Sequence, residues 1–366
     1  MDHRKRRGYT GQMPELDRPT RPVPAPLPAV LSGENADVYF LRTQQVLRID
    51  GRNPIVTMEA FCRKEGATLC GIDEVKGLLA VALREEAAAG RATVWGLRDG
   101  DVIGAKEVVL RIRAPYLSVA HLETAYLGAM AHGTGWATAA RAIVDAAAPT
   151  RVIAFGARHV HPNVADRLDH AALIGGAQGA STSAASARHG IPPVGTMPHA
   201  LVLIYGDTVE AALAFDRAME SDVPRIVLVD TFRDEAEESA RVAAALGDRL
   251  GGVRLDRASE LGGVTPELVA EVRAALDGAG ATSAKIVISG GLTVERIAQF
   301  KAAGSAVDTY AVGSAISGVR PIDFTADLHE IDGAPIGKRG RASGLTESPR
   351  LREVDLTAWR EATLNG

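Results

Sequence analysis

The chain has 366 residues, a net charge of −4 and 46% hydrophobic residues. This balance is typical of a globular protein, and it gives no reason to expect nucleic acid or an anionic membrane as a partner. Two cysteines, Cys62 and Cys70, are too few for a disulfide scaffold or for a four-cysteine zinc site. No apolar run approaches the roughly 18 residues that a membrane-spanning helix needs.

The first stretch, residues 1–33, is predicted to be an extended arm. Residues 4–7 are basic, but polar residues and prolines follow where a signal peptide would carry an apolar segment. Five prolines between 18 and 28 favour an extended conformation over a packed element. We therefore expect a cytoplasmic protein with a proline-rich arm.

Residues 34–120 have the texture of a small N-terminal α/β-sandwich domain. One helical stretch, 72–89, is surrounded by short runs rich in β-branched residues. These runs are 37–41, 54–61, 92–97 and 102–112. The polar segment 326–366 is expected to pack back onto this domain.

Residues 121–325 alternate short apolar runs with Ala-rich segments of helical length. Near-continuous apolar strands joined by helices indicate a parallel sheet covered by helices. The expected strands are 151–157, 172–176, 192–197, 225–231, 252–256, 285–291 and 309–314. Seven such units, with no GxGxxG after the first strand, predict an irregular TIM-like β/α barrel of about seven strands instead of a Rossmann domain.

Glycine-rich turns follow the last two predicted strands, at Gly290-Gly291 and Gly313-Ser314. Such turns expose backbone N–H groups, and β/α barrels often hold phosphate on the loops after their last strands. Each turn alone is explained by a tight connection, whereas the two together predict a phosphate site.

Charged residues fall at the same predicted strand ends. Arg158 and Arg254 carry guanidinium groups that bind phosphate or carboxylate in a bidentate manner, or form surface ion pairs. Asp256 lies two residues after Arg254 and so points to the same face. It is expected to hold ribose hydroxyls, water on Mg²⁺, or Arg254 itself.

An ordered set of motifs resembles the nicotinate phosphoribosyltransferase family. Between residues 36 and 325 these are DVY at 37–39, ETAYLG at 123–128, FGARH at 155–159, GTMPH at 195–199, VRLD at 253–256, ISGGL at 288–292 and YAVGS at 310–314. The resemblance implies a sandwich domain, an irregular barrel and a homodimer. It implies transfer of phosphoribosyl from phosphoribosyl pyrophosphate to nicotinate in NAD biosynthesis, with Mg²⁺ and with ATP as co-substrate.

The resemblance also implies residue roles. The matching positions assign catalysis to His199, Arg254 and Asp256, and substrate binding to Tyr39, Phe155, Arg158, Gln178, Thr196, Gly290, Gly291, Gly313 and Ser314. Phe155 would stack on the pyridine ring, and Tyr39 would reach in from the other subunit. His199 would be phosphorylated by ATP. Some relatives carry Asp where Gln178 stands, which leaves the pyridine substituent open, and no role is assigned to Glu123 or to any protein metal ligand.

Three alternatives compete with this interpretation. Quinolinate phosphoribosyltransferase has the same fold but needs a stronger cationic pocket for two carboxylates and no phosphorylated histidine. A barrel that binds a phosphorylated ligand without turnover would not need Arg254, Asp256 and His199 together. An aldolase or isomerase barrel would carry a lysine in its mouth, whereas Lys285 begins a predicted strand.

Overall fold

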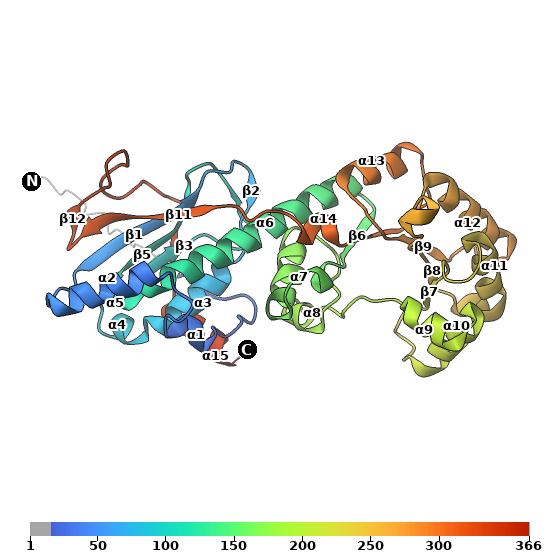
Figure 1. Cartoon of the computed structure of the whole chain (residues 1–366), viewed down its shortest axis with the longest axis horizontal. Coiled ribbons are helices and arrows are strands. Elements are labelled where there is room, and N and C mark those ends of the chain that lie inside the picture. The colour runs from blue at the N-terminus through green and yellow to red at the C-terminus, as the bar shows by residue number, and fades with distance from the viewer. Residues whose placement is uncertain (1–15, 366) are drawn as a thin grey trace, which may run out of the picture.

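The computed structural model describes residues 16–365 as two lobes that share one long helix, α6 (Glu123–Ala147), and the chain crosses back to the first lobe over residues 318–323 (Figure 1). The part of the predicted arm before residue 16 lies outside the described residues. The N-terminal lobe contains an antiparallel sheet with helices packed against it, and the C-terminal lobe contains a parallel sheet. None of the helices in the described range is long and apolar enough to cross a membrane.

The N-terminal lobe contains a six-stranded sheet in the order β12-β11-β1-β5-β3-β13. The strands are β1 (Ile55–Cys62), β3 (Thr93–Gly96), β5 (Val108–Pro115), β11 (Phe324–Ile331), β12 (Ala334–Pro335) and β13 (Arg352–Glu353). All pairings within this sheet are antiparallel. The C-terminal segment adds strands at both edges of it, because β11 pairs with β1 and β13 pairs with β3. The short strands β2 (Ala67–Thr68) and β4 (Val102–Ile103) pair separately.

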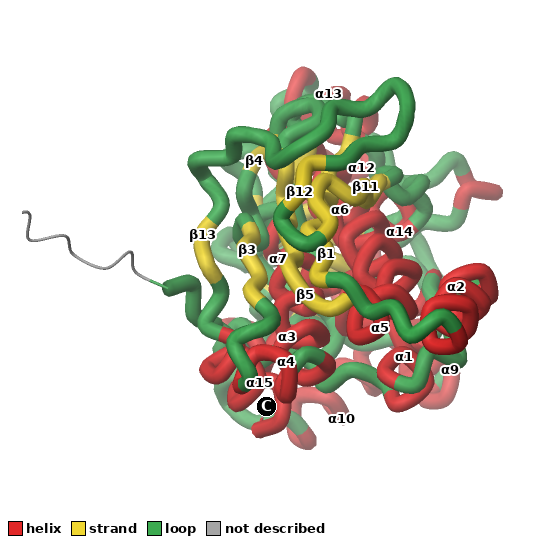
Figure 2. The backbone as a smooth tube through the Cα atoms, turned by 90° about the vertical axis from the view of Figure 1, so that its left-hand side faces the viewer, coloured by secondary structure: helices red, strands yellow, loops and turns green. Residues whose placement is uncertain are grey.

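Helices close one side of this sheet, and the C-terminal helix α15 (Leu356–Asn365) lies beside α3 (Ile72–Ala82) (Figure 2). The others in this lobe are α1 (Pro28–Leu31), α2 (Val38–Ile49), α4 (Arg84–Ala88), α5 (Tyr116–Val119) and the 3-10 turn η1 (Ala120–Leu122). Gly71, at φ +91°, precedes α3 where a Cβ would stand 2.4 Å from the carbonyl oxygen of Ala129 in α6. Glycine is therefore what lets α3 start against α6.

The strand expected at 37–41 is wrong, because these residues begin helix α2. Valine, tyrosine and phenylalanine favour strands locally, but Phe40 and Gln44 lie four residues apart and are the buried members of one helical face. The Gln44 side-chain amide donates to the carbonyl of Leu117 at 2.7 Å. Tertiary burial of this face overrides the local preference.

The C-terminal lobe holds a five-stranded parallel sheet in the order β6-β10-β9-β8-β7. The strands are β6 (Arg151–Ala154), β7 (Ile226–Leu228), β8 (Gly252–Leu255), β9 (Lys285–Ile288) and β10 (Thr309–Val312). The parallel α/β layer is as predicted, whereas the seven-stranded barrel is not seen, since β6 and β7 remain edge strands among the described residues.

Two of the seven expected strands account for the difference. Residues 172–174 end helix α7 (Ala165–Ile174), where the Ala-rich sequence packs with helical periodicity. Residues 192–197 form no regular element, because Pro192 and Pro193 cannot donate to a ladder. A single parallel bridge from Ala154 to Ala180 is all that extends the sheet at the β6 edge.

Helices cover the parallel sheet and set the positions of its loops. They are α8 (Ser183–Arg188), α9 (His199–Tyr205), α10 (Thr208–Ala218), α11 (Glu235–Leu246), α12 (Pro266–Gly278), α13 (Val294–Ala302) and α14 (Ser314–Ser317), with the 3-10 turns η2 (Ala157–His159), η3 (Pro162–Val164), η4 (Gly247–Arg249) and η5 (Ser259–Leu261). Thr293 caps α13 by accepting from the backbone N–H of Arg296, and Thr265 caps α12 likewise from Leu268. These caps fix where the loops after β8 and β9 end.

Candidate active site

A cavity of about 550 Å³ opens at the carboxyl ends of the parallel strands. The loops after β6, β8, β9 and β10 line it, together with residues 181–182 and 194–196. This is the edge at which ligands bind in parallel α/β sheets. The cavity brings together every sequence-predicted site residue except Tyr39, Gln178 and His199.

Arg254 lines the cavity and contacts several of the other residues that line it. It projects from β8, and its guanidinium donates to the Thr196 hydroxyl at 3.0 Å and to Asp256 Oδ2 at 2.7 Å. Its carbon Cζ lies 5.4 Å from the centroid of the Phe155 ring. A planar cation held this way next to an aromatic face can receive a flat anionic ligand.

Ser289 is a site residue that the sequence interpretation missed. It is buried at the end of β9, accepts from Arg254 Nε at 2.9 Å and donates to Asp256 Oδ1 at 2.9 Å. The Arg254–Asp256 pair is therefore fixed at both ends. The signal available in the sequence was its place directly before Gly290, at a predicted strand end.

The two glycine turns make room for this network and for a ligand. Gly290 has φ +85°, and a Cβ on it would stand 3.1 Å from Asp256 Oδ1. At Gly313 a Cβ would stand 2.9 Å from the imidazole carbon Cε1 of His159. Both turns border the cavity beside the charged wall, and backbone N–H groups of such turns are donors that a phosphate site can use.

The opposite wall includes His159, Ser181 and Thr182, none of which was predicted as a ligand-binding residue. His159 lines the cavity, with its Nδ1 2.9 Å from the hydroxyl of Ser317. The buried Asp169 accepts from the backbone N–H of Thr182 at 2.8 Å and from the Ser181 hydroxyl at 3.2 Å. Burial raises the pKa of the Asp169 carboxyl, against the lowering effect of these hydrogen bonds.

His199 lies in an adjoining recess and not in the cavity itself. Its Nε2 is 3.1 Å from Asp230 Oδ2, and the recess is shared with Asp256 and Arg257. Burial raises the pKa of the Asp230 carboxyl, while the hydrogen bond from His199 opposes that shift. The second oxygen, Asp230 Oδ1, is buried without a hydrogen-bond partner among the described residues.

Comparison with known proteins places the chain in a family. The quinolinate phosphoribosyl transferase C-terminal domain model matches residues 136–327, and the N-terminal domain model of the same enzyme matches residues 37–134. The chain belongs to the quinolinate phosphoribosyltransferase family. The crystal structure of nicotinate-nucleotide pyrophosphorylase from Pyrococcus furiosus agrees, with a TM-score of 0.80 and 34% identity over 93% of this chain and 96% of that one.

Curated relatives bear the name that the sequence motifs suggested. A nicotinate phosphoribosyltransferase of Mycobacterium tuberculosis is 35% identical over 275 residues, which are 73% of this chain and 59% of that protein. One from Bacillus subtilis is 33% identical over 226 residues, 60% of this chain and 44% of its own length. The chain thus spans less than two thirds of these relatives. The resemblance to nicotinate phosphoribosyltransferases is confirmed at this level.

The specific activity that the sequence predicted is wrong. We expected an ATP-coupled nicotinate phosphoribosyltransferase acting through a phosphohistidine at His199. Both lobes instead match models of quinolinate phosphoribosyltransferase, and the Pyrococcus structure is named for nicotinate-nucleotide pyrophosphorylase. The alternative of a quinolinate or related pyridine phosphoribosyltransferase has the better support.

In this member of the quinolinate phosphoribosyltransferase family, the two remaining predicted substrate-binding residues, Gln178 and Tyr39, lie outside the cavity of their own chain, and the predicted role of Tyr39 in a neighbouring subunit stays a prediction. The Gln178 side chain accepts from the backbone N–H of Val152 at 2.7 Å and donates to the carbonyl of Gly176 at 2.8 Å. It is therefore engaged near the start of β6 and does not line the cavity. Tyr39 lies on α2, is 55% exposed, and does not line the cavity of its own chain.

Proposed function

We propose that the protein is a pyridine-carboxylate phosphoribosyltransferase of the quinolinate type. It would transfer phosphoribosyl from phosphoribosyl pyrophosphate to the ring nitrogen of quinolinate or a related pyridine carboxylate and release pyrophosphate. The observation that carries the proposal is Arg254, fixed by Thr196, Ser289 and Asp256 next to the Phe155 ring. Family membership and the relatives' names support the same class of reaction.

The residues suit each part of this reaction. Phe155 offers an apolar face to the pyridine ring, while Arg254 and Arg158 supply positive charge for its carboxylate. As the ring nitrogen bonds to the ribosyl C1, the C1–oxygen bond breaks and pyrophosphate leaves with its electrons. Asp256 would hold the ribose hydroxyls and stabilise the positive charge that develops on the sugar. With quinolinate, formation of a nicotinate nucleotide also requires loss of one carboxylate as carbon dioxide, and a proton from solvent takes its place on the ring carbon.

Phosphate would be held by the glycine turns. The backbone N–H groups at Gly290-Gly291 and Gly313-Ser314 border the cavity beside Arg158. Uncovered backbone donors next to a guanidinium form an anion site without needing any further side chain. The 5′-phosphate of the ribosyl donor fits this end of the cavity by charge.

A magnesium ion fits the recess shared by Asp230 and Asp256. Asp230 Oδ1 is buried without a hydrogen-bond partner among the described residues, and carboxylate oxygens are the ligands that Mg²⁺ prefers. These two residues would hold the ion, which when bound would neutralise charge on the departing pyrophosphate. His199 would orient Asp230 through their 3.1 Å contact.

We also propose that two copies share their active sites. Helix α2 exposes Val38, Tyr39, Val46 and Ile49, a continuous set of large apolar side chains that water solvates poorly. Helix α9, beside the open edge of the sheet, exposes Leu203, Ile204 and Tyr205. Pairing of α2 with the open lobe of a second copy would cover both patches and bring Tyr39 to the neighbour's cavity.

The test is pyrophosphate release from phosphoribosyl pyrophosphate and Mg²⁺ in the absence of ATP. Quinolinate, nicotinate and nicotinamide are offered separately to the full chain. We expect turnover of a pyridine carboxylate and none of nicotinamide, which lacks the charge that Arg254 and Arg158 would bind. If the protein binds phosphoribosyl pyrophosphate but converts none of the three pyridines, it is a non-catalytic binding protein and the proposal is refuted.

A further inference from the structure

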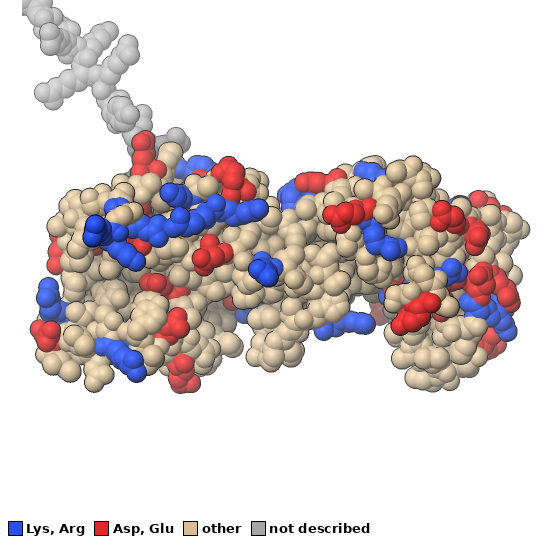
Figure 3. Space-filling view, turned by 45° about the horizontal axis from the view of Figure 1, so that its top comes forward, with Lys and Arg blue, Asp and Glu red and all other residues tan. Residues whose placement is uncertain are grey.

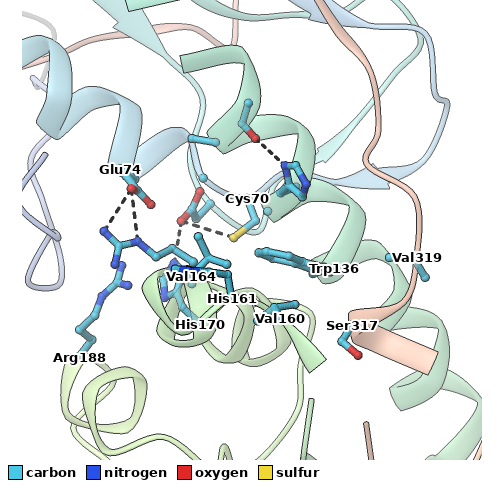
Figure 4. Close-up of a pocket in the computed structure, with 17 residues that line it drawn as sticks. Cys70, Glu74, Trp136, Val160, His161, Val164, His170, Arg188, Ser317 and Val319 are labelled. Carbon is cyan, nitrogen blue, oxygen red and sulfur yellow. Dashed lines mark hydrogen bonds and ion pairs between the residues drawn. The ribbon is translucent and has the colours of Figure 1, made fainter. Parts of the chain in front are cut away.

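A second cavity, of about 490 Å³, lies between the lobes and shares no lining residue with the active-site cavity. It is bordered by the segment before α3, by α6 and by α7 (Figure 4). Figure 4 shows the side chains of Cys70, His161, His170 and Trp136 grouped around one part of this space. The phosphoribosyl chemistry proposed above uses none of them.

Three different donor atoms converge on its wall. Cys70 Sγ, an Asp99 carboxylate oxygen and a ring nitrogen of His170 all lie within 4.8 Å of one another. Asp99 Oδ2 is 3.0 Å from His170 Nε2 and 3.9 Å from Cys70 Sγ. A tetrahedral zinc ion with ordinary bond lengths needs ligand atoms roughly 3.3–3.6 Å apart. These separations are close enough for an ion to be held with small side-chain movements.

The backbone fixes these donors in place. Asp99 Oδ1 accepts from the N–H groups of Ile72 and Asp73 at the start of α3, which leaves Oδ2 directed at the cluster. The backbone N–H of Cys70 is hydrogen-bonded to the Thr134 hydroxyl of α6 at 3.2 Å. The Cys70 and Asp99 side chains are each about 1% exposed. Bulk water therefore does not compete for these ligand atoms.

His189 supplies the outer contact that metal-bound histidines have. His170 Nδ1 is 2.8 Å from His189 Nε2, on the side of the ring away from Asp99. A histidine that binds metal through Nε2 donates its Nδ1–H to such a partner, which fixes the tautomer. Among the described residues, the nearby Lys76 ammonium is held by Asp17 at 2.7 Å and by Asp73 at 3.2 Å, and Arg188, which also lines this cavity, donates to the carbonyl of Pro22.

We propose that Cys70, Asp99 and His170 bind a zinc ion whose fourth position opens into this cavity. A mixed set of sulfur, nitrogen and carboxylate oxygen in a tetrahedral arrangement selects zinc over magnesium or calcium, which prefer six or more oxygens. Three protein ligands with one open position leave room for water or a small solute. On binding, the Cys70 thiol loses its proton to solvent and the sulfur bonds to the metal as thiolate.

The test uses the purified full chain, stripped with a chelator and dialysed against Zn²⁺ or Co²⁺ alone. We expect one tightly bound metal per chain and, with Co²⁺, a thiolate-to-cobalt charge-transfer band in the near ultraviolet. Cys70→Ser should abolish that band. Cys62→Ser is the matched control, because Cys62 is also buried, packs in the core of the N-terminal lobe, and has its sulfur hydrogen-bonded to the carbonyl of Lys64. His189→Leu should weaken zinc affinity on the order of 10–100-fold while keeping the band.

The magnesium recess at Asp230 and Asp256 is lined by no cysteine, so cobalt bound there cannot give the thiolate-to-cobalt band. Absence of the band in wild-type protein loaded with Co²⁺ would overturn the proposal without any variant. So would a band that survives in folded Cys70→Ser protein or disappears in Cys62→Ser. If Cys70→Ser does not fold, the same comparison is made with His170→Gln, which should lower metal affinity at least as much as His189→Leu.

Discussion

Replacing Arg254 with methionine removes the guanidinium but keeps an unbranched apolar side chain of similar reach. The change breaks three hydrogen bonds, to Thr196, Ser289 and Asp256, of which the last is a charge pair at 2.7 Å. The two charged side chains are only 16% and 23% exposed. Truncating one partner of such a desolvated pair typically costs about 2–5 kcal/mol of binding. That corresponds to a loss of roughly 30-fold to 4,000-fold in kcat/KM, at about 1.4 kcal/mol for each factor of ten.

The assay is initial-rate pyrophosphate release with the pyridine carboxylate varied at fixed phosphoribosyl pyrophosphate. Arg91→Met is the matched control, because Arg91 forms an exposed ion pair with Glu86 in the other lobe, and such pairs contribute about 0–1 kcal/mol. The near-ultraviolet circular dichroism of both variants should match wild type. Unchanged kinetics in a folded Arg254→Met protein would show that the cavity around Arg254 is not where the substrates react.

Three further outcomes follow from the same structure. Gly290→Ala places a Cβ 3.1 Å from Asp256 Oδ1 at φ +85°, so it should raise KM for phosphoribosyl pyrophosphate and destabilise the fold by about 1–2 kcal/mol in urea unfolding; wild-type values would contradict the role of this turn. Ser289→Ala should lower kcat/KM by roughly tenfold, because it frees both Arg254 and Asp256; equal rates would show that this hydroxyl does not position them. Burial, reinforced by Asp327 and Asp37, raises the pKa of Glu123 to about 7 from an ordinary 4.5. At a pH between these two pKa values, Glu123 is protonated in the folded state and ionised in the unfolded state. The free energy of unfolding should therefore fall by about 2 kcal/mol as the pH rises from the lower value to the higher one. Glu123→Gln should flatten this dependence in urea titrations, and an unchanged slope would exclude Glu123 as its source.

The sequence located the active-site cavity well because its main residues follow strand ends. Arg254 lies in β8 and Asp256 directly follows that strand, while Gly290-Gly291 comes just after β9, so local periodicity was enough to place them on one edge of the sheet. Ser289 was missed because its role depends on two residues of the neighbouring strand, which periodicity does not reveal.

Errors arose where long-range packing decided the structure. The Val-Tyr-Phe-Leu run at 38–41 has strand propensity, yet the face that it buries beneath residue 117 makes it helical. Gln178 follows a predicted strand, but that segment is helical, and its amide turns back to the start of β6. The cluster at Cys70, Asp99 and His170 joins residues 29 and 71 positions apart, a spacing that matches no local metal motif.

The molecular surface drawn in Figure 3 carries charges of both signs, in keeping with the small net charge of −4. Figure 3 shows a band of Lys and Arg over the strand-rich lobe, while both signs are scattered over the rest of that face. A surface of mixed sign on this scale does not steer a polyanion along the molecule. Attraction for the anionic substrates therefore depends on the local field of the guanidinium groups at the cavity mouth.

The single helix α6 has a mechanical consequence for the whole protein. Its first half places Tyr126 and Met130 in the core of the N-terminal lobe, and its second half places Trp136, Ala140 and Ile143 in the core of the other. A continuous helix embedded at both ends resists bending, so the lobes are held at a fixed angle instead of swinging about a hinge. Severing the chain anywhere along α6 would strip apolar surface from both cores at once. Heating should accordingly melt both lobes in one calorimetric transition, and neither half should express as a folded fragment.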